Sequence, residues 1–451
     1  MDNNALRIAL TTAAQHLQAG RLRDVEATVV PVLRAVPRNA DANVFMAIAC
    51  HKQGRLQEAL SWGRKAAELA PRDANILGTL GTILISANQT EEALDTFEKL
   101  TRANPKSAQA FFTLGTLYTR VGRLQDAANA FRTLDRLAGG QPQTKRNLAN
   151  ALYEIEEYEE ALEPARIAAE ALPQDKNAQY TYGKVALASG HPDVALRVFE
   201  SLNDGGMFAM KSLAYREVAL RELGRETEAD AISRYDDYVW PIKLEAPQGF
   251  SSLAEFNNAI CEEMLRHPDI EDAPTHRATR NGRKVSQLLE KPSPLMATFG
   301  KMIQGAVGEM QRHLVRDASD GPFPTAPPPG PCNIDLWVNI MHRQGHQLPH
   351  FHPQGWLSGC YYARIPERVE SSGDAHEGWI EFGRPAYHLP HTKEPKLRIV
   401  KPEEGLIVLF PSYMFHRTVP FESDDLRISF AFDVVPRGWV ADALGRTGAE
   451  V

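Results

Sequence analysis

The stretch of sequence that decides the fold of the C-terminal half opens with PHFHPQGWLSGCYYA, residues 349–363. It continues with GWIEFGRP (378–385) and closes with LIVLFPSYMFHRTVPFESDDLRISFAFDVV (406–435). The stretch consists of short apolar runs that glycine, proline or charged residues separate. Such runs predict β-strands, and a series of them is typical of a sandwich or a barrel.

The strand pattern extends outward to IDLWVNIM (334–341), which alternates Ile334, Leu336, Val338 and Ile340 with Trp337 and Asn339. Before it, SSLAEFNNAICEEMLRHP (251–268) predicts a helix with Ser251 or Ser252 as its N-cap. A second helix is predicted over about residues 295–316. The polar segment HRATRNGRKVSQLL (276–289) is predicted to be a loop, and the proline-rich GPFPTAPPPGPC (321–332) breaks both helix and strand. This half is therefore predicted to be α+β.

Histidines gather in the opening stretch, because eight of the chain's fourteen lie between positions 342 and 416. His350 and His352 are two residues apart, so an extended strand points both to one face. His416 follows a later strand, and the three can occupy one face of a metal octahedron, with open positions left for other ligands. Imidazole suits Fe(II), and also zinc, copper and nickel. The remaining five are expected in loops near the mouth of the barrel: His342, His346, His376, His388 and His391.

An anion-binding site is predicted in the last strand. Arg427 and Ser429 alternate with apolar residues and therefore share a face. Arginine presents a planar fork that binds a carboxylate through two hydrogen bonds. The alternative is a surface arginine paired with Asp424 or Asp425.

The N-terminal half is a repeat with a period of 34 residues. The aligned segments start at Ala19, Gln53, Ala87, Val121, Ile155, Ser189 and Leu223. One phase of the repeat carries Val25, Ala59, Ala93, Ala127, Ala161, Ala195 and Ala229, and another carries Gly81, Gly115 and Gly183. Small residues let paired helices approach closely, and proline at Pro37, Pro71, Pro105 and Pro173 ends the second helix.

These repeat positions resemble the tetratricopeptide repeat family over about residues 5–235. The resemblance implies a helical superhelix whose concave groove commonly binds peptides or protein partners. We therefore expect a protein or peptide partner in the repeat groove. A purely structural or dimerising array is the alternative.

HPQGWLSGCYY, GWIEFGRP, LFPSYMFHRTVPF and RISFAFDVVP resemble the 2-oxoglutarate- and Fe(II)-dependent oxygenases, in a branch where that domain follows tetratricopeptide repeats. The resemblance covers roughly residues 245–437 and implies a double-stranded β-helix. It implies that His350 is the first iron ligand and His416 the distal ligand. It further implies that Arg427, Ser429 and Tyr362 bind the far carboxylate of 2-oxoglutarate.

The sequence departs from this family at His352, where the family carries Asp or Glu. Three neutral histidines leave Fe(II) with its full charge, which dianionic 2-oxoglutarate would neutralise. His352 is predicted to be the third ligand. Three alternatives stay open: His352 lies behind the ligands, Glu381 supplies a carboxylate, or the protein is a three-histidine dioxygenase that needs no oxo acid.

The predicted architecture is multidomain. An all-α tetratricopeptide-repeat superhelix (1–235) is followed by a linker (236–250), helical support (251–330) and an α+β double-stranded β-helix core of jelly-roll or cupin type (331–451). The predicted activity is hydroxylation of a C–H bond with Fe(II), 2-oxoglutarate and O2, on a protein, peptide or carrier-bound substrate. The alternative is a repeat adaptor whose barrel senses metal or oxo acid without turnover.

Composition excludes several other classes. A net charge of -7 disfavours binding to nucleic acid through charge. No segment approaches the roughly 18 unbroken apolar residues of a membrane span, and the N-terminus shows no secretory signal. The four cysteines are far apart and form no CxxC pair. We therefore expect a cytoplasmic protein that contacts neither nucleic acid nor membrane.

Overall fold

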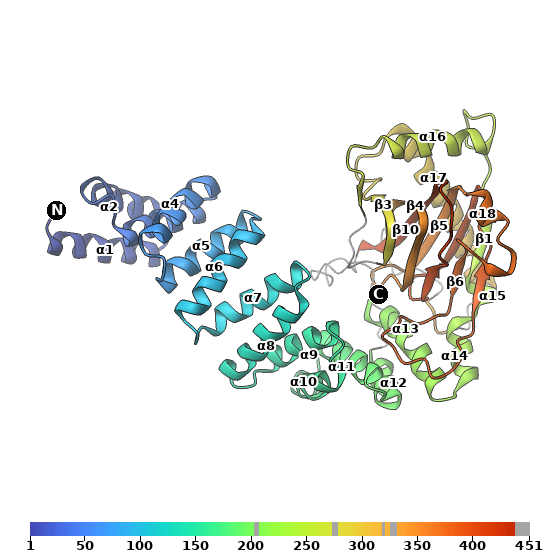
Figure 1. The fold of residues 1–451 in the computed structure, drawn as a ribbon, viewed down its shortest axis with the longest axis horizontal. Coiled ribbons are helices and arrows are strands. Elements are labelled where there is room, and N and C mark those ends of the chain that lie inside the picture. The colour runs from blue at the N-terminus through green and yellow to red at the C-terminus, as the bar shows by residue number, and fades with distance from the viewer. Residues whose placement is uncertain (203–206, 273–277, 318–320, 325–331, 438–451) are drawn as a thin grey trace. The chain divides into compact units, whose positions relative to one another are not determined.

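The computed structural model describes residues 1–202, 207–272, 278–317, 321–324 and 332–437 (Figure 1). The chain divides into two compact units, Met1–Ala168 and Ala169–Val451. This division lies inside the repeat array and does not coincide with the predicted boundary at residue 235. The domain boundaries stay predictions.

The helices of the repeat array follow one another in pairs. Up to the division they are α1 (Asn3–Gln18), α2 (Leu22–Ala35), α3 (Ala40–Lys52), α4 (Leu56–Leu69), α5 (Ala74–Ser86), α6 (Thr90–Ala103), α7 (Ala108–Arg120), α8 (Leu124–Ala138), α9 (Pro142–Glu154) and α10 (Tyr158–Ala171). The second unit begins with α11 (Lys176–Ala188), α12 (Pro192–Ser201), α13 (Met207–Glu222), α14 (Glu226–Ser233) and the short α15 (Tyr235–Tyr238). The predicted tetratricopeptide-type superhelix is confirmed.

Close packing within each helix pair follows from the small residues of the repeat. All seven residues of the Val25 and Ala59 phase are no more than 1% exposed. The glycines are needed for a second reason, since a Cβ at Gly81, Gly115 or Gly183 would lie 2.6 to 2.7 Å from a phenylalanine ring of the paired helix. Those rings belong to Phe97, Phe131 and Phe199.

The C-terminal half is an antiparallel sheet that curves into a barrel-like domain, which confirms the predicted fold class. Its strands are β1 (Trp240–Lys243), β2 (Glu271–Asp272), β3 (Thr279–Val285), β4 (Cys332–His350), β5 (Leu357–Arg364), β6 (Ile380–Phe382), β7 (Arg398–Val400), β8 (Leu406–Pro411), β9 (His416–Thr418) and β10 (Arg427–Pro436). The order across the sheet is β1-β8-β5-β10-β4-β9-β6-β7, with β3 paired to β2 and β4.

Two helices cover one face of this sheet, α16 (Leu253–Leu265) and α17 (Pro294–Asp317) (Figure 1). Both were predicted, and Ser252 caps α16 by accepting a hydrogen bond from the Glu255 amide. Phe299 of α17 packs its ring against Tyr361 of β5 and Phe430 of β10. Because strand residues alternate between faces, Arg427, Ser429, Ala431 and Asp433 of β10 point away from α17, into the barrel.

The prediction that residues 276–289 form a loop is wrong for residues 279–285, and residues 276 and 277 lie outside the described residues. Residues 279–285 form β3, which pairs with β4 from Thr279 opposite Gln347 to Val285 opposite Val338, with a shift of register between Arg280 and Gly282. Of this strand only Thr279 and Val285 are buried, so its polar side chains gave no period-2 apolar pattern. Most of the proline-rich stretch at 321–332 lies outside the described residues.

The last helix pair of the array packs against the barrel within the second unit. Tyr215 of α13 places its ring edge-on to Phe351 and Phe415, with ring centroids 5.7 and 6.3 Å away. The Tyr413 hydroxyl donates to the Ile232 carbonyl oxygen at 2.6 Å. The Glu222 carboxylate accepts from the Thr392 amide and hydroxyl.

This last pair differs from the others in its core. At the phase of Gly183 it carries Glu217, which is buried and accepts hydrogen bonds from Arg221. Burial raises the pKa of the Glu217 carboxyl, while Arg221 opposes that shift. Arg221 also donates to Asp230 and Ser233. A buried polar network thus replaces the glycine and phenylalanine contact where the array meets the barrel.

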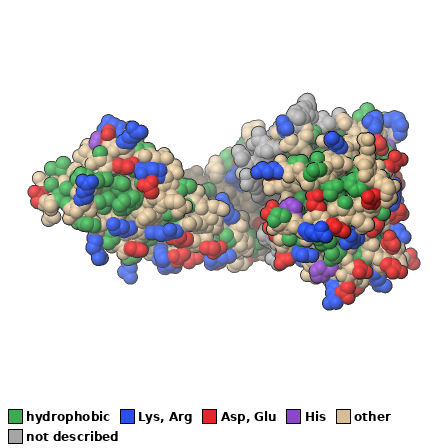
Figure 2. Space-filling view, turned by 90° about the horizontal axis from the view of Figure 1, so that it is seen from above, with side chains coloured by type: hydrophobic (Ala, Val, Ile, Leu, Met, Phe, Trp, Pro, Cys, Tyr) green, Lys and Arg blue, Asp and Glu red, His purple; other side chains and the backbone are tan. Residues whose placement is uncertain are grey.

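Across the described residues, no helix is long and apolar enough to cross a membrane. Figure 2 shows acidic and basic side chains interspersed over the visible face of each unit.

Candidate metal centre

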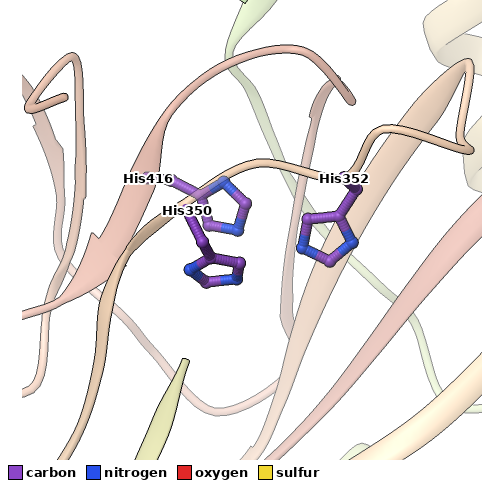
Figure 3. Close-up of side chains that lie close together, drawn as sticks. All are labelled: His350, His352 and His416. Carbon is purple, nitrogen blue, oxygen red and sulfur yellow. The ribbon is translucent and has the colours of Figure 1, made fainter. Parts of the chain in front are cut away.

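The sheet brings three histidines together at the end of β4. His350 is the last residue of β4 and pairs with His416, the first residue of β9. His352 follows two residues later, where its amide donates to the Ser412 carbonyl oxygen. One ring nitrogen from each histidine lies within 4.8 Å of the other two, and all three side chains are buried (Figure 3). Phe351 between them points to the opposite side, toward Tyr215 and Phe415.

Each ring has its Nδ1 atom occupied by an oxygen acceptor. The Nδ1 atom of His350 lies 2.7 Å from the Leu348 carbonyl oxygen, and that of His416 lies 3.0 Å from the Met414 carbonyl oxygen. The Nδ1 atom of His352 lies 2.9 Å from Oδ2 of Asp433. Since an oxygen acceptor requires a proton on Nδ1, the neutral rings keep their Nε2 lone pairs free. Three such lone pairs make a facial ligand set.

Burial keeps His350 and His416 neutral. It lowers the pKa of His350 to about 3, with the neighbouring His352 adding to the shift. Burial and the two other rings also hold the pKa of His416 well below its usual value. Metal ions bind the neutral form of imidazole, so these two rings do not have to lose a proton first.

A pocket of about 360 Å³, its open mouth included, connects the histidines to Arg427. It is lined by Trp337, Gln347, His350, His352, Ser358, Gly359, Cys360, Tyr362, Ile380, Phe410, His416, Thr418, Arg427 and Ala431. The metal-ligand candidates and two of the three predicted co-substrate residues therefore face one cavity. The third, Ser429, lies behind them and accepts a hydrogen bond from Arg427 at 3.1 Å.

Arg427 is a buried cation with neutral partners. Its side chain is 1% exposed and donates to the Gly378 carbonyl oxygen and to Ser429 Oγ. The alternative of a surface arginine is wrong, since Asp424 pairs with Arg343 instead. Among the described residues no acidic group forms an ion pair with Arg427. A buried guanidinium without a counter-ion suits an anionic ligand.

Tyr362 offers a second donor to the same ligand. Its ring lies under the Arg427 guanidinium, 5.1 Å from the ring centroid. Its hydroxyl is buried and forms no hydrogen bond of good geometry among the described residues, although Cys360 and the Arg427 guanidinium interact with it. Burial raises the pKa of Tyr362 well above its usual value, so the hydroxyl keeps its proton and can donate. The residues of the pocket thus fit a metal ion, which His350, His352 and His416 would hold, and an anionic group, which Arg427 and Tyr362 would bind.

Glu381 lies outside this pocket. Its carboxylate accepts from Arg384 and Arg417, each at 2.6 to 2.7 Å. It is therefore not placed to supply the missing carboxylate ligand. The five other histidines of the stretch do not line the pocket, and His342 and His346 lie within β4 rather than in loops.

Comparisons with known families agree with this geometry. Residues 335–433 match the family described as "Putative 2OG-Fe(II) oxygenase", and residues 38–106, 79–142 and 146–208 match tetratricopeptide repeat families. Residues 38–208 carry tetratricopeptide repeats, and residues 335–433 belong to a domain of the type described in that family model. No curated protein matches it.

Several solved repeat structures are similar to part of the chain. PilF of Pseudomonas aeruginosa is 22% identical over 45% of this chain and 91% of its own, with a TM-score of 0.37. YrrB, a repeat protein with an unusual peptide-binding site, is 18% identical over 44% and 97%, with a TM-score of 0.36. A repeat protein from Parabacteroides merdae is 17% identical over 52% and 92%, with a TM-score of 0.36.

Two residues that contact the His352 ring were not predicted from the sequence. Asp433 accepts from His352, and Trp337 stacks on the His352 ring with centroids 5.6 Å apart. The alternation of β10 already placed Asp433 on the face of Arg427. Nothing in the sequence pairs it with a histidine 81 positions earlier.

Proposed function

We propose that this protein is a 2-oxoglutarate- and Fe(II)-dependent oxygenase that hydroxylates a C–H bond. The observation that carries the proposal is one pocket that contains three free imidazole nitrogens and a buried arginine without a counter-ion. A non-catalytic adaptor has no need for both halves of this arrangement.

In this proposal His350, His352 and His416 hold the metal through Nε2. When bound, Fe(II) supplies the activation of dioxygen that is coupled to oxidative decarboxylation of 2-oxoglutarate to succinate and carbon dioxide. Arg427 and Tyr362 bind the far carboxylate of the oxo acid and so fix its orientation. The apolar side chains of Trp337, Ile380 and Phe410 line the pocket and limit the entry of water.

The substrate class follows from the repeats. Tetratricopeptide repeats commonly bind protein or peptide partners, and extended arrays present large concave surfaces. A protein, a peptide or a carrier-bound molecule is therefore the proposed substrate.

The test is an anaerobic mixture of the protein, Fe(II) and 2-oxoglutarate that is then exposed to O2, with succinate quantified. Succinate should form above the rate of a His416→Ala variant, with or without candidate peptides. Equal rates in the two proteins, across several candidate substrates, would refute the proposal.

The three-histidine set favours one second candidate, a dioxygenase that needs no oxo acid. Oxygen uptake separates the two candidates. Uptake that requires 2-oxoglutarate supports the first, whereas uptake with a substrate but without 2-oxoglutarate supports the second.

A further inference from the structure

The three histidines differ in the acceptor of the hydrogen bond from Nδ1. His350 and His416 donate to backbone carbonyl oxygens, whereas His352 donates to a carboxylate. The Nδ1 atom of His352 lies 2.8 Å from Oδ1 and 2.9 Å from Oδ2 of Asp433. His352 is also the residue that stands where the resembled family has Asp or Glu. The carboxylate therefore lies behind the one histidine that replaces a charged ligand of the resembled family.

Asp433 is itself held in place. It lies opposite Ser358 in the pairing of β10 with β5, and the Ser358 hydroxyl donates to its Oδ1 atom at 2.6 Å. Ser358 and Ser412 share a further hydrogen bond of 2.8 Å, and both side chains are buried. The Ser412 carbonyl oxygen accepts from the His352 amide. These contacts fix the carboxylate and the backbone of His352 relative to each other.

We infer that Asp433 is a positioning residue of the metal centre, which orients His352 and returns one negative charge to a three-histidine site. The inference rests on the proposed metal-binding function. A carboxylate on Nδ1–H fixes the tautomer, aims Nε2 at the metal and makes the imidazole a stronger base. With Fe(II) bound by three neutral rings, a carboxylate one hydrogen bond away leaves a net charge of about +1. A two-histidine, one-carboxylate site carries the same charge, so Asp433 compensates for the exchange at position 352.

The test measures metal affinity rather than turnover. The full chain, stripped of metal, is titrated with Co(II) under nitrogen, since the visible bands of Co(II) report its coordination, and with Fe(II) by competition. Asp433→Asn keeps the size of the side chain and an acceptor for His352, but removes the charge. Loss of a carboxylate behind a metal-bound histidine typically costs 10- to 100-fold in affinity, and we expect a loss in that range.

The matched control is Asp335→Asn. Asp335 lies opposite Asp433 in the pairing of β4 with β10, so this change removes the same charge from the same pair of strands. Asp335 interacts electrostatically with Asp433 and His352 but forms no hydrogen bond to His352, so we expect a much smaller loss of affinity than in Asp433→Asn. An equal loss of metal affinity in both variants would show that nearby negative charge matters, and not the hydrogen bond to His352.

A second pair of variants separates positioning from a structural role. His352→Asp supplies the carboxylate directly and places it beside Asp433, so adding Asp433→Asn to His352→Asp should raise metal affinity. A merely structural Asp433 would lower affinity by the same factor in both backgrounds, which would overturn the inference. Thermal unfolding of each variant checks the fold.

Failure of the inference can be told apart from failure of the proposed function. A wild-type protein that binds neither Co(II) nor Fe(II) refutes both. A wild-type protein that binds metal and forms succinate, while Asp433→Asn binds metal equally well, refutes the inference alone.

Discussion

Among single residues, Arg427 is the hardest to replace, because its buried guanidinium can bind a carboxylate through two hydrogen bonds. We expect Arg427→Lys to raise the KM for 2-oxoglutarate about 10- to 100-fold, since hydrogen bonds to charged groups contribute about 1.5–3 kcal/mol and lysine supplies no fork. Affinity for Fe(II) should stay unchanged. Succinate formation against 2-oxoglutarate concentration measures the first quantity, and anaerobic titration the second.

The control for this change is Arg343→Lys, because Arg343 is exposed and pairs with Asp424. Its kinetics should equal those of the wild type. An unchanged KM in Arg427→Lys would place the oxo acid elsewhere.

The hydroxyl of Tyr362 should act in opposite directions on stability and on binding. It is buried and forms no hydrogen bond of good geometry among the described residues, which costs up to about 1–3 kcal/mol. Tyr362→Phe should therefore leave the free energy of unfolding unchanged or increase it, while it weakens 2-oxoglutarate binding. Urea unfolding with and without the oxo acid measures both effects. A variant that is less stable and binds equally well would contradict the assignment.

Sequence reasoning found the residues that share a strand or a short spacing. His350 and His352 follow from alternation within one strand, and Arg427 with Ser429 follows from another. Asp433 was not predicted as a partner of His352, because their contact joins β10 to the end of β4. Such cross-strand contacts depend on register, which a single sequence does not state.

At the scale of elements, the helix pairs show a complementary exchange of large and small residues. Gly115 faces Phe131 in α7 and α8, whereas the next repeat carries Ala149 and Ala165 at the same two phases. A Cβ at Gly115 would lie 2.7 Å from the Phe131 ring. The repeat therefore also indicates that the residue sizes at these two phases depend on each other.

From this pairing we predict that Gly115→Ala changes the free energy of unfolding in opposite directions in two backgrounds. Gly115→Ala should destabilise the wild type by about 1–3 kcal/mol through overpacking. In a Phe131→Ala background the clash is gone, and the same change should stabilise by up to about 1 kcal/mol, because alanine favours the helix over glycine. Urea unfolding of the four proteins measures this cycle. An equal cost in both backgrounds would contradict it.

Among the strands, β3 was missed although its neighbour β4 was predicted. Arg283 and Lys284 lie within the strand, and pairing with β4 supplies its backbone hydrogen bonds without an apolar face of its own. Tertiary pairing thus overrides the polar local pattern. The short β9 was missed for a different reason, because three residues are too few to show a period.

On the scale of the whole molecule, the last helix pair of the repeat array packs against the segments that carry the three histidines. Phe351 lies between two candidate ligands and Phe415 precedes the third, and both rings pack on Tyr215 of α13. We expect Tyr215→Leu to weaken Fe(II) binding up to about tenfold, because each such aromatic pair contributes about 0.5–1.5 kcal/mol beyond its buried area. Anaerobic titration measures the change.

The control for Tyr215 is Tyr118→Leu, a buried tyrosine of α7 in the first unit. It should lower stability and leave metal affinity as in the wild type. Equal metal affinity in Tyr215→Leu and the wild type would show that α13 does not support the ligands.

The buried network of Glu217 and the packing of Tyr215 also determine which parts of this protein can be inserted, deleted or separated during evolution. A gene rearrangement that adds or deletes whole 34-residue repeats ahead of α10 leaves the contacts of Tyr215 and Glu222 with the barrel in place. A break between α14 and β1 would instead separate Tyr215 from Phe351 and Glu222 from Thr392. The length of the array is therefore free to vary between descendants, while its last helix pair has to be inherited together with the barrel.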